Sequence, residues 1–360
     1  MEEYIVCGVD AHERTLDCQV GVGREEPRRR RFTNTREGRR ELFEELGVMR
    51  EQVGAGKVLL GYEASPLGYV LYDECMEECM ECVVLAPTKI ARSVQDRKRK
   101  YDERDATRIF EALRAHVLAG NALPAIWIPG LQTRDDREVC RCRLDLTEKL
   151  TAVKAQVRML LKRNRVEKPE EVGGSWTLGD RAWLEGLRLT EGAQAWLSCL
   201  LRQVDALEEE IERLDRALVK LAEEDRYQAA ARALCGMGGI GVLTAMVFLA
   251  EMGDLRRFRN RKQIGAYLGL VPSSHESGEG DDRKGHITRE GPARVRKVLC
   301  QAVWSRLRTD AGEADAYRRV VERNPKHKKI AVVACMRRLG ILMWHRALDA
   351  QESSIRATAA

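Results

Sequence analysis

Short apolar runs alternate with helical stretches over the first third of the chain. Strands are predicted at residues 4–10, 15–22, 28–33, 57–63 and 83–86, and helices at about 36–46, 66–81 and 102–118. Three neighbouring strands followed by alternating helices and strands are typical of an α/β domain with a mixed sheet. We assign residues 1–134 to this domain.

From about residue 135 the pattern changes to long amphipathic helices. Apolar residues recur at steps of three and four at Leu146, Leu150, Val153, Val157 and Leu160, and again at Leu197, Leu200, Val204, Leu207, Ile211, Leu214, Leu218 and Leu221. This spacing is the heptad seam of a coiled coil. The polar link at 164–180 would let the two helices fold back as an antiparallel hairpin, and a dimerising arm fits equally well. We assign residues 135–230 to this helical region.

A glycine-rich turn opens the third region. Four glycines lie within residues 236–241, and an apolar helical run follows at once. Such a turn exposes backbone N–H groups at a helix N-terminus, where phosphate binds readily. The pattern resembles helix-hairpin-helix turns, which grip the DNA backbone, so Gly239, Gly241 and Thr244 are candidate contacts; a purely structural turn is the alternative. We expect a mainly helical domain over 231–346 and a disordered tail over 347–360.

The charge is nearly balanced overall but clustered locally. The chain has 62 basic and 56 acidic residues, and basic side chains concentrate at 28–31, 97–100 and 326–329. Clusters of this kind favour contact with a polyanion, although solvated loops are the simpler interpretation of any one of them.

The remaining composition indicates a reduced, cytoplasmic setting with no membrane partner. Eleven cysteines in a chain of 360 residues do not suggest a disulfide framework. The N-terminus lacks the features of a signal peptide, and the longest strongly apolar run, 242–250, is too short to cross a bilayer.

Four carboxylates carry the candidate chemistry. Asp10 and Glu63 each end an apolar run, and Asp102 and Asp105 begin a helix three residues apart. Acids at strand ends beside a helical acidic pair form an oxygen-rich site suited to Mg²⁺, with one ion or with two that clamp a phosphodiester. A turn or cap residue is the simpler interpretation of Asp10 alone, but the set of four favours a metal site. Lys100 is a candidate phosphate contact beside it.

Other acids and thiols nearby are assigned structural roles. Cys75, Cys79 and Cys82 are expected on one helix without a nearby fourth ligand, so reduced core cysteines are favoured over a zinc site. Solvated surface positions are expected for the remaining acids of this region, Asp17, Asp96, Glu103 and Glu111.

Motifs along nearly the whole chain carry a family resemblance. They are Gly8-Val9-Asp10, Tyr62-Glu63-Ala64, Lys100-Tyr101-Asp102 with Asp105-Ala106, and the segments 238–245, 258–263, 266–272, 277–278, 284–291 and 294–307. In this order they resemble the DEDD transposases of insertion sequence family 110. These are bridge-RNA-guided recombinases, and the pilin-gene inverting recombinase is among their relatives.

The resemblance implies a RuvC-like, RNase H-fold catalytic domain, a coiled-coil linker and a C-terminal transposase domain with a helix-hairpin-helix-like motif. It implies that Ser277 is a nucleophile acting with a metal held by the four carboxylates. Because His275 and Glu276 precede that serine, Ser273 and Ser274 remain rivals. It also makes basic residues of the C-terminal motifs candidate nucleic-acid contacts, namely Arg259, Lys262, Lys284 and Arg289.

The partners implied by the resemblance are double-stranded donor and target DNA, a structured non-coding guide RNA, and further copies of the chain in a dimer or tetramer. A prokaryotic, nucleoid-associated protein is expected. Two alternatives stay open on the residues alone. One is a Holliday-junction resolvase-type nuclease that uses the carboxylates with water, and the other is a non-enzymatic scaffold that binds nucleic acid.

Overall fold

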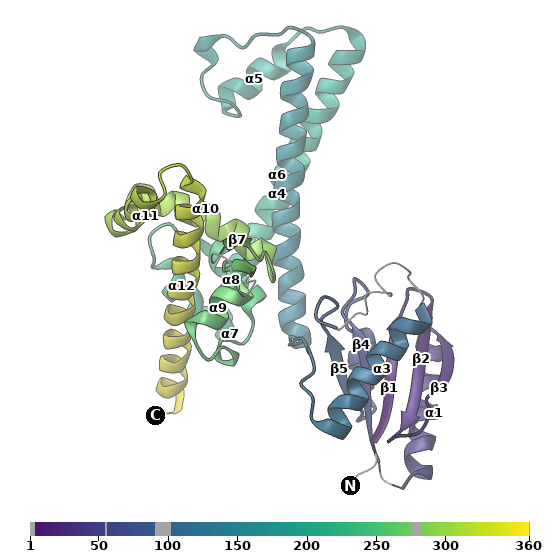
Figure 1. The fold of residues 1–360 in the computed structure, drawn as a ribbon. Coiled ribbons are helices and arrows are strands. Elements are labelled where there is room, and N and C mark those ends of the chain that lie inside the picture. The colour runs from purple at the N-terminus through teal and green to yellow at the C-terminus, as the bar shows by residue number, and fades with distance from the viewer. Residues whose placement is uncertain (1–3, 55, 91–101, 276–282, 360) are drawn as a thin grey trace. The chain divides into compact units, whose positions relative to one another are not determined.

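The chain folds into two compact units. The computed structural model describes residues 4–54, 56–90, 102–275 and 283–359 (Figure 1). One unit comprises Met1–Ile128 and the other Pro129–Ala360. Among the described residues, no helix is both long and apolar enough to cross a bilayer.

The N-terminal unit is built on a mixed five-stranded sheet. Its strands are β1 (Tyr4–Ala11), β2 (Thr15–Val22), β3 (Arg28–Thr33), β4 (Lys57–Glu63) and β5 (Glu81–Leu85), in the order β3-β2-β1-β4-β5. The first three strands pair antiparallel through short turns, whereas β1, β4 and β5 pair parallel because helices connect them. The predicted α/β domain with a mixed sheet is confirmed.

Helices cover both faces of this sheet. Helices α1 (Arg36–Gln52) and α2 (Val70–Glu77) share a core with Ile5, Cys7 and Val9 of β1, whereas α3 (Asp102–Ala119) packs on the opposite face with Val6. Alternation along β1 produces this division, since successive side chains of a strand point to opposite faces. Helix α2 is shorter than the predicted 66–81, because Gly68 precedes it and Cys79 follows it with positive φ, a conformation that a helix does not contain.

Two glycines let α3 lie directly on the sheet backbone. Gly8 and Gly61 are register partners on β1 and β4. A Cβ at Gly8 would lie 2.7 Å from the Ala106 carbonyl oxygen and 2.3 Å from the Phe110 nitrogen. Further along α3, Arg114 donates to the carbonyl of Glu25 in the β2–β3 turn. Helix α3 therefore runs antiparallel to β1, with its first turn at the carboxyl ends of β1 and β4 (Figure 1).

The second unit begins with a long antiparallel helical hairpin. Helices α4 (Leu131–Arg163) and α6 (Glu191–Glu223) contain 33 residues each and are joined by a link with η1 (Glu170–Val172) and α5 (Leu178–Gly186). Ion pairs join Arg143 to Asp215 and Lys154 to Glu208, so positions advance along α4 as they retreat along α6. The heptad pattern thus forms a hairpin within one chain, the first of the two arrangements left open by the sequence.

The hairpin base belongs to the C-terminal core. The helices there are α7 (Asp225–Cys235), α8 (Val242–Met252), α9 (Arg261–Tyr267), α10 (Ala293–Thr309), α11 (Ala311–Arg323) and α12 (Lys328–Ala359), with η2 (Leu255–Arg257) and the strands β6 (Pro272–His275) and β7 (Arg283–Ile287). Leu144, Leu218 and Leu221 of the hairpin are buried in the same cluster as α8 and α10. Buried Arg137 of α4 also donates to the carbonyls at the end of α8. Residues 135–230 and 231–346 therefore form one unit, because the last turns of the heptad seam pack against the C-terminal helices.

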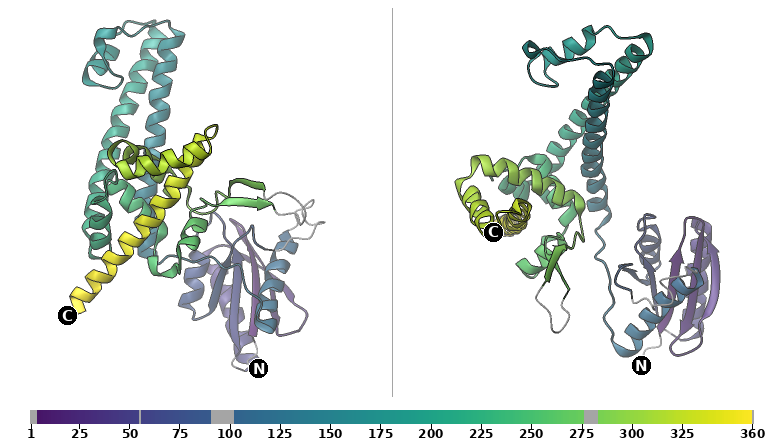
Figure 2. Two further views of the ribbon diagram at one scale, coloured as in Figure 1. Left: turned by 60° about the vertical axis from the view of Figure 1, so that its left-hand side comes forward. Right: turned by 45° about the horizontal axis from the view of Figure 1, so that its top comes forward.

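The expected disordered tail over 347–360 is wrong for the residues described. Helix α12 continues without interruption to Ala359 (Figure 2). Ala347 is fully buried, and the residues after it contain neither proline nor glycine. Alanine, glutamine, glutamate and arginine are good helix formers, so this polar segment extends a helix whose earlier turns are anchored in the core.

Candidate functional site

Asp10 and Glu63 lie at the same edge of the N-terminal sheet. The parallel register of β1 and β4 ends with Val9 opposite Tyr62, and the two acids follow directly on their strands. Strand alternation places both on the face of Gly8 and Gly61, which is the face that α3 covers. Two carboxylates are thus adjacent at the carboxyl ends of neighbouring parallel strands.

The start of α3 brings the helical acids to that edge. The carbonyl of Ala106 lies against Gly8, so Asp105, one residue earlier, belongs to the turn nearest the strand ends. Asp105 forms an ion pair with Arg108 on the same helix. Asp102 is the first residue of α3, and its side chain lies outside the described residues.

A histidine that the sequence reasoning missed contacts Asp10. The Nε2 atom of His12 lies 3.2 Å from Oδ2 of Asp10. The turn that follows β1 at His12 is held in place by Asn34, which donates through Nδ2 to the His12 carbonyl at 2.7 Å. Imidazole nitrogen and carboxylate oxygen are both common metal ligands, so His12 adds a donor atom next to Asp10. The signal in the sequence was a histidine two residues beyond a strand-end acid.

Asp17 is buried and ion-paired, which corrects its assignment to the solvated surface. It is the register partner of Asp10 on β2, and its side chain is 4% exposed. Arg29 lies 3.2 Å and Arg31 3.6 Å from its oxygens. Buried acids are tolerated when they are paired. The signal in the sequence was an acid on β2 together with the run of arginines on β3, and it was overlooked because each strand was considered alone.

The acids share an edge but do not form a closed ligand cluster. Among the described residues, no group of three or more His, Cys, Asp or Glu side chains is arranged to hold a metal ion. Asp10 is held by His12, and Asp105 by Arg108. The donor chemistry nevertheless fits a hard divalent cation, because all four candidate ligands are carboxylates. A metal would have to compete with these basic neighbours.

The cysteine trio is spread over different elements. Cys75 is buried on α2 and donates to the Met80 carbonyl, whereas Cys79 is exposed in the following turn and Cys82 lies on β5. Hydrogen bonding with Cys75 and burial raise the pKa of the Cys82 thiol. A zinc ligand requires a thiolate, so a raised pKa opposes metal binding here. The expectation that all three lie on one helix is wrong, because α2 ends at Glu77.

The glycine-rich turn joins α7 to α8. Gly239 is exposed with φ +79°, and Gly241 is the N-cap of α8, whose first turn carries half-buried Thr244. Arg306 braces the turn from inside: its Nη1 donates to the Gly238 carbonyl at 2.7 Å. The turn is therefore fixed from the core side, while its glycine backbone faces outward at a helix N-terminus.

Arg306 is held in turn by Glu313, a buried acid of α11, and by Asp310, the partly exposed N-cap of that helix. It pairs with Asp310 and lies 3.6 Å from Glu313, which also pairs with Arg338 of α12 at 3.0 Å. Glu313 is 1% exposed. This network fixes the glycine turn relative to α10, α11 and α12, because buried charges tolerate little displacement from their partners.

Comparison with known proteins identifies the family. The transposase model of DEDD type for insertion sequence 110 matches residues 7–165, and the model of the IS116/IS110/IS902 transposase family matches residues 231–319. The chain belongs to the IS110/IS116 family of transposases.

Relatives extend over most of this transposase. The y4qE protein of Sinorhizobium fredii, whose name assigns it to the transposases, is 29% identical over 318 residues, covering 81% of this chain and 76% of its own. The transposase for insertion sequence element IS1533 of Leptospira borgpetersenii is 25% identical, covering 68% and 69%. The transposase for IS1111A of Coxiella burnetii is 27% identical, covering 51% and 50%. Family membership implies a DNA substrate and dependence on a divalent metal.

The serine segment of the transposase is only partly described. Strands β6 and β7 form an antiparallel pair in which Ser274 is opposite Lys284. Ser277 and Lys100 lie outside the described residues, as does the side chain of Lys284. The rival Ser273 is engaged within the hairpin, because its hydroxyl donates to the His286 carbonyl at 3.0 Å.

Three predicted basic contacts of the transposase are exposed. Arg259 and Lys262 flank Asn260, which caps α9 by accepting from the backbone of its first turn. Arg289 follows β7 with φ +57°. None of the three forms an ion pair with a described residue, so their charges are available to an anion.

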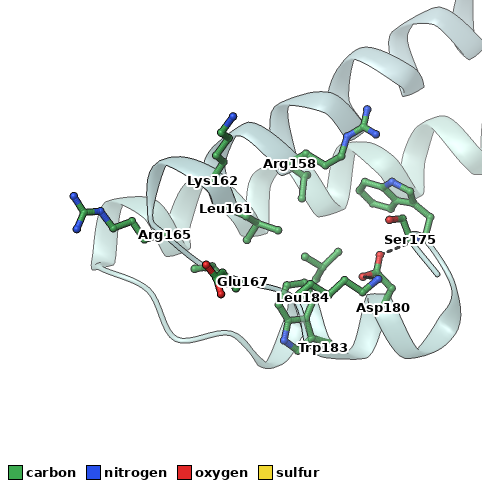
Figure 3. Close-up of a pocket in the computed structure, with 13 residues that line it drawn as sticks. Arg158, Leu161, Lys162, Arg165, Glu167, Ser175, Asp180, Trp183 and Leu184 are labelled. Carbon is green, nitrogen blue, oxygen red and sulfur yellow. Dashed lines mark hydrogen bonds and ion pairs between the residues drawn. The ribbon is translucent and has the colours of Figure 1, made fainter. Parts of the chain in front are cut away.

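A cavity lies at the hairpin end of the transposase, and none of the predicted site residues lines it (Figure 3). It measures about 490 Å³, and Leu161, Trp183 and Leu184 form part of its wall. Its buried acid, Asp180, is satisfied by Lys168 at 2.6 Å and by a backbone N–H. Active sites combine a cavity with convergent reactive groups. This one contains a neutralised acid, so we assign it to the packing of the hairpin end.

Proposed function

We propose that this transposase is a recombinase in which an RNase H-like metal site acts together with a serine nucleophile. One observation carries the proposal. Asp10 and Glu63 continue adjacent parallel strands on the face that α3 covers, and α3 begins there with Asp102 and Asp105. The sheet order, with three antiparallel strands followed by two parallel ones, supports the RuvC-like assignment.

The four carboxylates would hold Mg²⁺, as one ion or two. Bound there, the metal supplies Lewis-acid stabilisation of the charge that develops on a phosphodiester. Residues of the chain flank the site: His12 lies 3.2 Å from the Asp10 carboxylate, and Arg108 pairs with that of Asp105. Ligation by Asp105 would require it to exchange Arg108 for the metal. Arg108 would then be released close to the phosphate.

Ser277 would make the covalent step. Its hydroxyl oxygen attacks the scissile phosphorus, a serine–phosphate bond forms, and the bond to the leaving deoxyribose oxygen breaks. The serine proton is passed on, and the leaving oxygen gains a proton as a free hydroxyl. Attack by a different strand's hydroxyl reverses these steps and releases the serine. The phosphoserine bond conserves the phosphodiester energy, so joining needs no nucleotide cofactor.

The C-terminal region would hold the nucleic acid. The outward glycine backbone at Gly239 and Gly241, with Thr244, fits a phosphate at a helix N-terminus. The basic residues of this region assigned to the same role are Arg259, Lys262, Lys284 and Arg289, and Lys100 of the N-terminal unit would add a phosphate contact beside the carboxylates. We propose that a structured guide RNA pairs with donor and target DNA, which leaves backbone and shape to the protein. Exchange between several cut strands implies a dimer or tetramer.

A resolvase-type nuclease is the second candidate, because the same acids can activate water without Ser277. The test compares Ser277→Ala with Ser273→Ala on full-length protein, supplied with donor DNA, target DNA and RNA transcribed from the flanks of the gene. With Mg²⁺, Ser273→Ala should form a protein–DNA adduct that resists denaturation, and Ser277→Ala should not. Cleavage at full rate by Ser277→Ala with no adduct would establish the nuclease instead.

A scaffold without enzymatic activity is tested by Asp102→Asn. We expect this change to remove Mg²⁺-dependent cleavage and leave DNA binding in place, since it removes one ligand charge. Unchanged cleavage would remove Asp102 from the metal site. If cleavage proceeded equally well when the transcript was omitted, only the proposed guide role of the RNA would be contradicted.

A further inference from the structure

The four consecutive arginines of β3 divide between two faces of the sheet. Residues of a strand alternate, so Arg28 and Arg30 share one face and Arg29 and Arg31 the other. The strand register shows which face each pair occupies. Arg30 is opposite Cys18, a member of the core shared with α1, and Arg31 is opposite Asp17. Arg29 and Arg31 therefore lie on the face that carries Asp10 and Glu63.

Asp17 orients the second pair. Its carboxylate is 4% exposed and contacts Arg29 at 3.2 Å and Arg31 at 3.6 Å. The arginine side chains remain 48% and 64% exposed. A guanidinium has five N–H donors in a rigid fork, so one that pairs with an acid and stays this exposed can also bind an anion from the solvent side. The buried acid fixes the two guanidiniums at the catalytic edge without covering them.

Arg30 has a different environment on the other face. Its Nε donates to Glu45 of α1 at 2.6 Å, and Glu45 is itself partly exposed. This contact is a surface ion pair between a strand and a helix, of a kind that contributes little to stability. The pair Arg28 and Arg30 and the pair Arg29 and Arg31 are thus of the same residue type, on the same strand and all exposed. They differ in the face of the sheet on which they lie.

The spacing suits a nucleic-acid backbone. Asp17 is opposite Asp10, and Arg31 is opposite Asp17, so the three lie in one row across neighbouring strands. Two strand spacings amount to roughly 10 Å. Each strand of a duplex carries a phosphate about every 3.4 Å along its axis. A strand held at the carboxylates therefore has other phosphates within reach of the two arginines.

We propose that Arg29 and Arg31, oriented by Asp17, bind the phosphodiester backbone of the strand that is cut at the carboxylates. The proposal rests on the metal-site function above and adds a binding site to it. Protection of an exposed sheet edge by charge is the competing explanation. That explanation treats all four arginines alike, whereas the proposal separates the two pairs.

The test uses Arg29→Ala/Arg31→Ala, with Arg28→Ala/Arg30→Ala as the matched control of equal charge. Affinity for a fluorescent DNA duplex is measured by anisotropy at several salt concentrations on full-length protein. The first variant should lose about tenfold in affinity, and its slope of log affinity against log salt should fall by about 2, since each phosphate contact contributes about 0.9. The control should stay within about twofold of the parent. Equal effects of the two pairs would overturn the proposal.

A second variant covers the case in which an unpaired Asp17 unfolds the domain. Asp17→Asn/Arg29→Gln/Arg31→Gln leaves no uncompensated buried charge, and it should show the same loss of DNA binding with a circular dichroism spectrum like the parent's. Parent-like binding by this variant would also overturn the proposal. Failure of the metal-site function is recognised separately: Asp10→Asn would then cleave normally, whatever the arginine pairs do.

Discussion

The acids of the predicted metal site are arranged differently from the buried acids of the C-terminal unit. Among the described residues of the C-terminal unit, four buried acids are scattered. Each has a basic partner, in the pairs Asp136–Arg226, Asp180–Lys168, Glu251–Arg141 and Glu313–Arg338. At the metal site of the N-terminal unit, three of the four candidate ligands, Asp10, Glu63 and Asp105, have described side chains and lie at one sheet edge, with Asp10 and Asp105 16% and 17% exposed. Scattered, fully paired acids hold helices together. Gathered acids repel one another and favour binding of a cation.

The largest effect is expected from breaking a scattered pair. Asp136 accepts hydrogen bonds from Arg226 and from the buried Tyr227 hydroxyl, so Asp136→Ala leaves the hydroxyl without this partner and leaves partly exposed Arg226 with Glu224. Removing one partner of a buried ion pair costs about 3–5 kcal/mol. Urea unfolding of the full chain should show this loss in the transition of the C-terminal unit. Glu212→Ala, an exposed position, is the control. Equal stability of the two variants would contradict the assigned role of the scattered acids.

Removing a gathered acid should instead affect activity. Asp10→Asn should reduce DNA cleavage at least about a hundredfold, because the loss of a residue that only orients a metal ligand already costs about 10–100-fold. The free energy of unfolding should change by less than about 1 kcal/mol, as expected for a partly exposed pair. Steady-state cleavage and urea unfolding measure the two quantities. Glu111→Gln, an exposed acid of α3, should change neither. If Asp10→Asn lost as much stability as Asp136→Ala, the distinction between acids that serve cleavage and acids that stabilise the fold would be contradicted.

A smaller effect is expected where packing supports the gathered acids. Gly8→Ala places a methyl group 2.3 Å from the Phe110 nitrogen, so α3 must move away from the strand. Overpacking of this kind costs about 1–3 kcal/mol. It should also lower cleavage, because α3 carries two of the acids. Gly47→Ala is the control: its methyl group has open space within α1, and it should stabilise by about 0.5–1 kcal/mol. Normal cleavage by a destabilised Gly8→Ala variant would show that the distance between α3 and the sheet does not affect cleavage.

Much of the fold could be predicted because its signals are local. Short apolar runs located strands such as β1 and β4, and heptad spacing located α4 and α6. Two errors came from features that local patterns do not contain. The polar segment after Ala347 is helical because it continues a helix that is anchored in the core. The base of the hairpin merges with the C-terminal domain because Leu218 and Leu221 have a second partner there.

Only those residues of the candidate site that lie at recognisable strand ends could be placed from the sequence. Asp10 and Glu63 could be placed together because acids that follow parallel strands meet at one edge. His12 and Asp17 were missed, since their proximity to Asp10 arises from the turn after β1 and from the pairing of β1 with β2. Cross-strand register depends on how strands align, and a single-strand pattern does not specify it.

The antiparallel hairpin also has a mechanical consequence. At 1.5 Å per residue, each 33-residue helix is about 50 Å long. Its base is fastened at Arg137 to the end of α8. A tilt of about 10° at that fastening would sweep the far end through roughly 9 Å over this length. The hairpin is therefore a lever that magnifies small rotations of the C-terminal helices. Cys199, exposed near the far end, is a natural place for a fluorescent reporter of such motion.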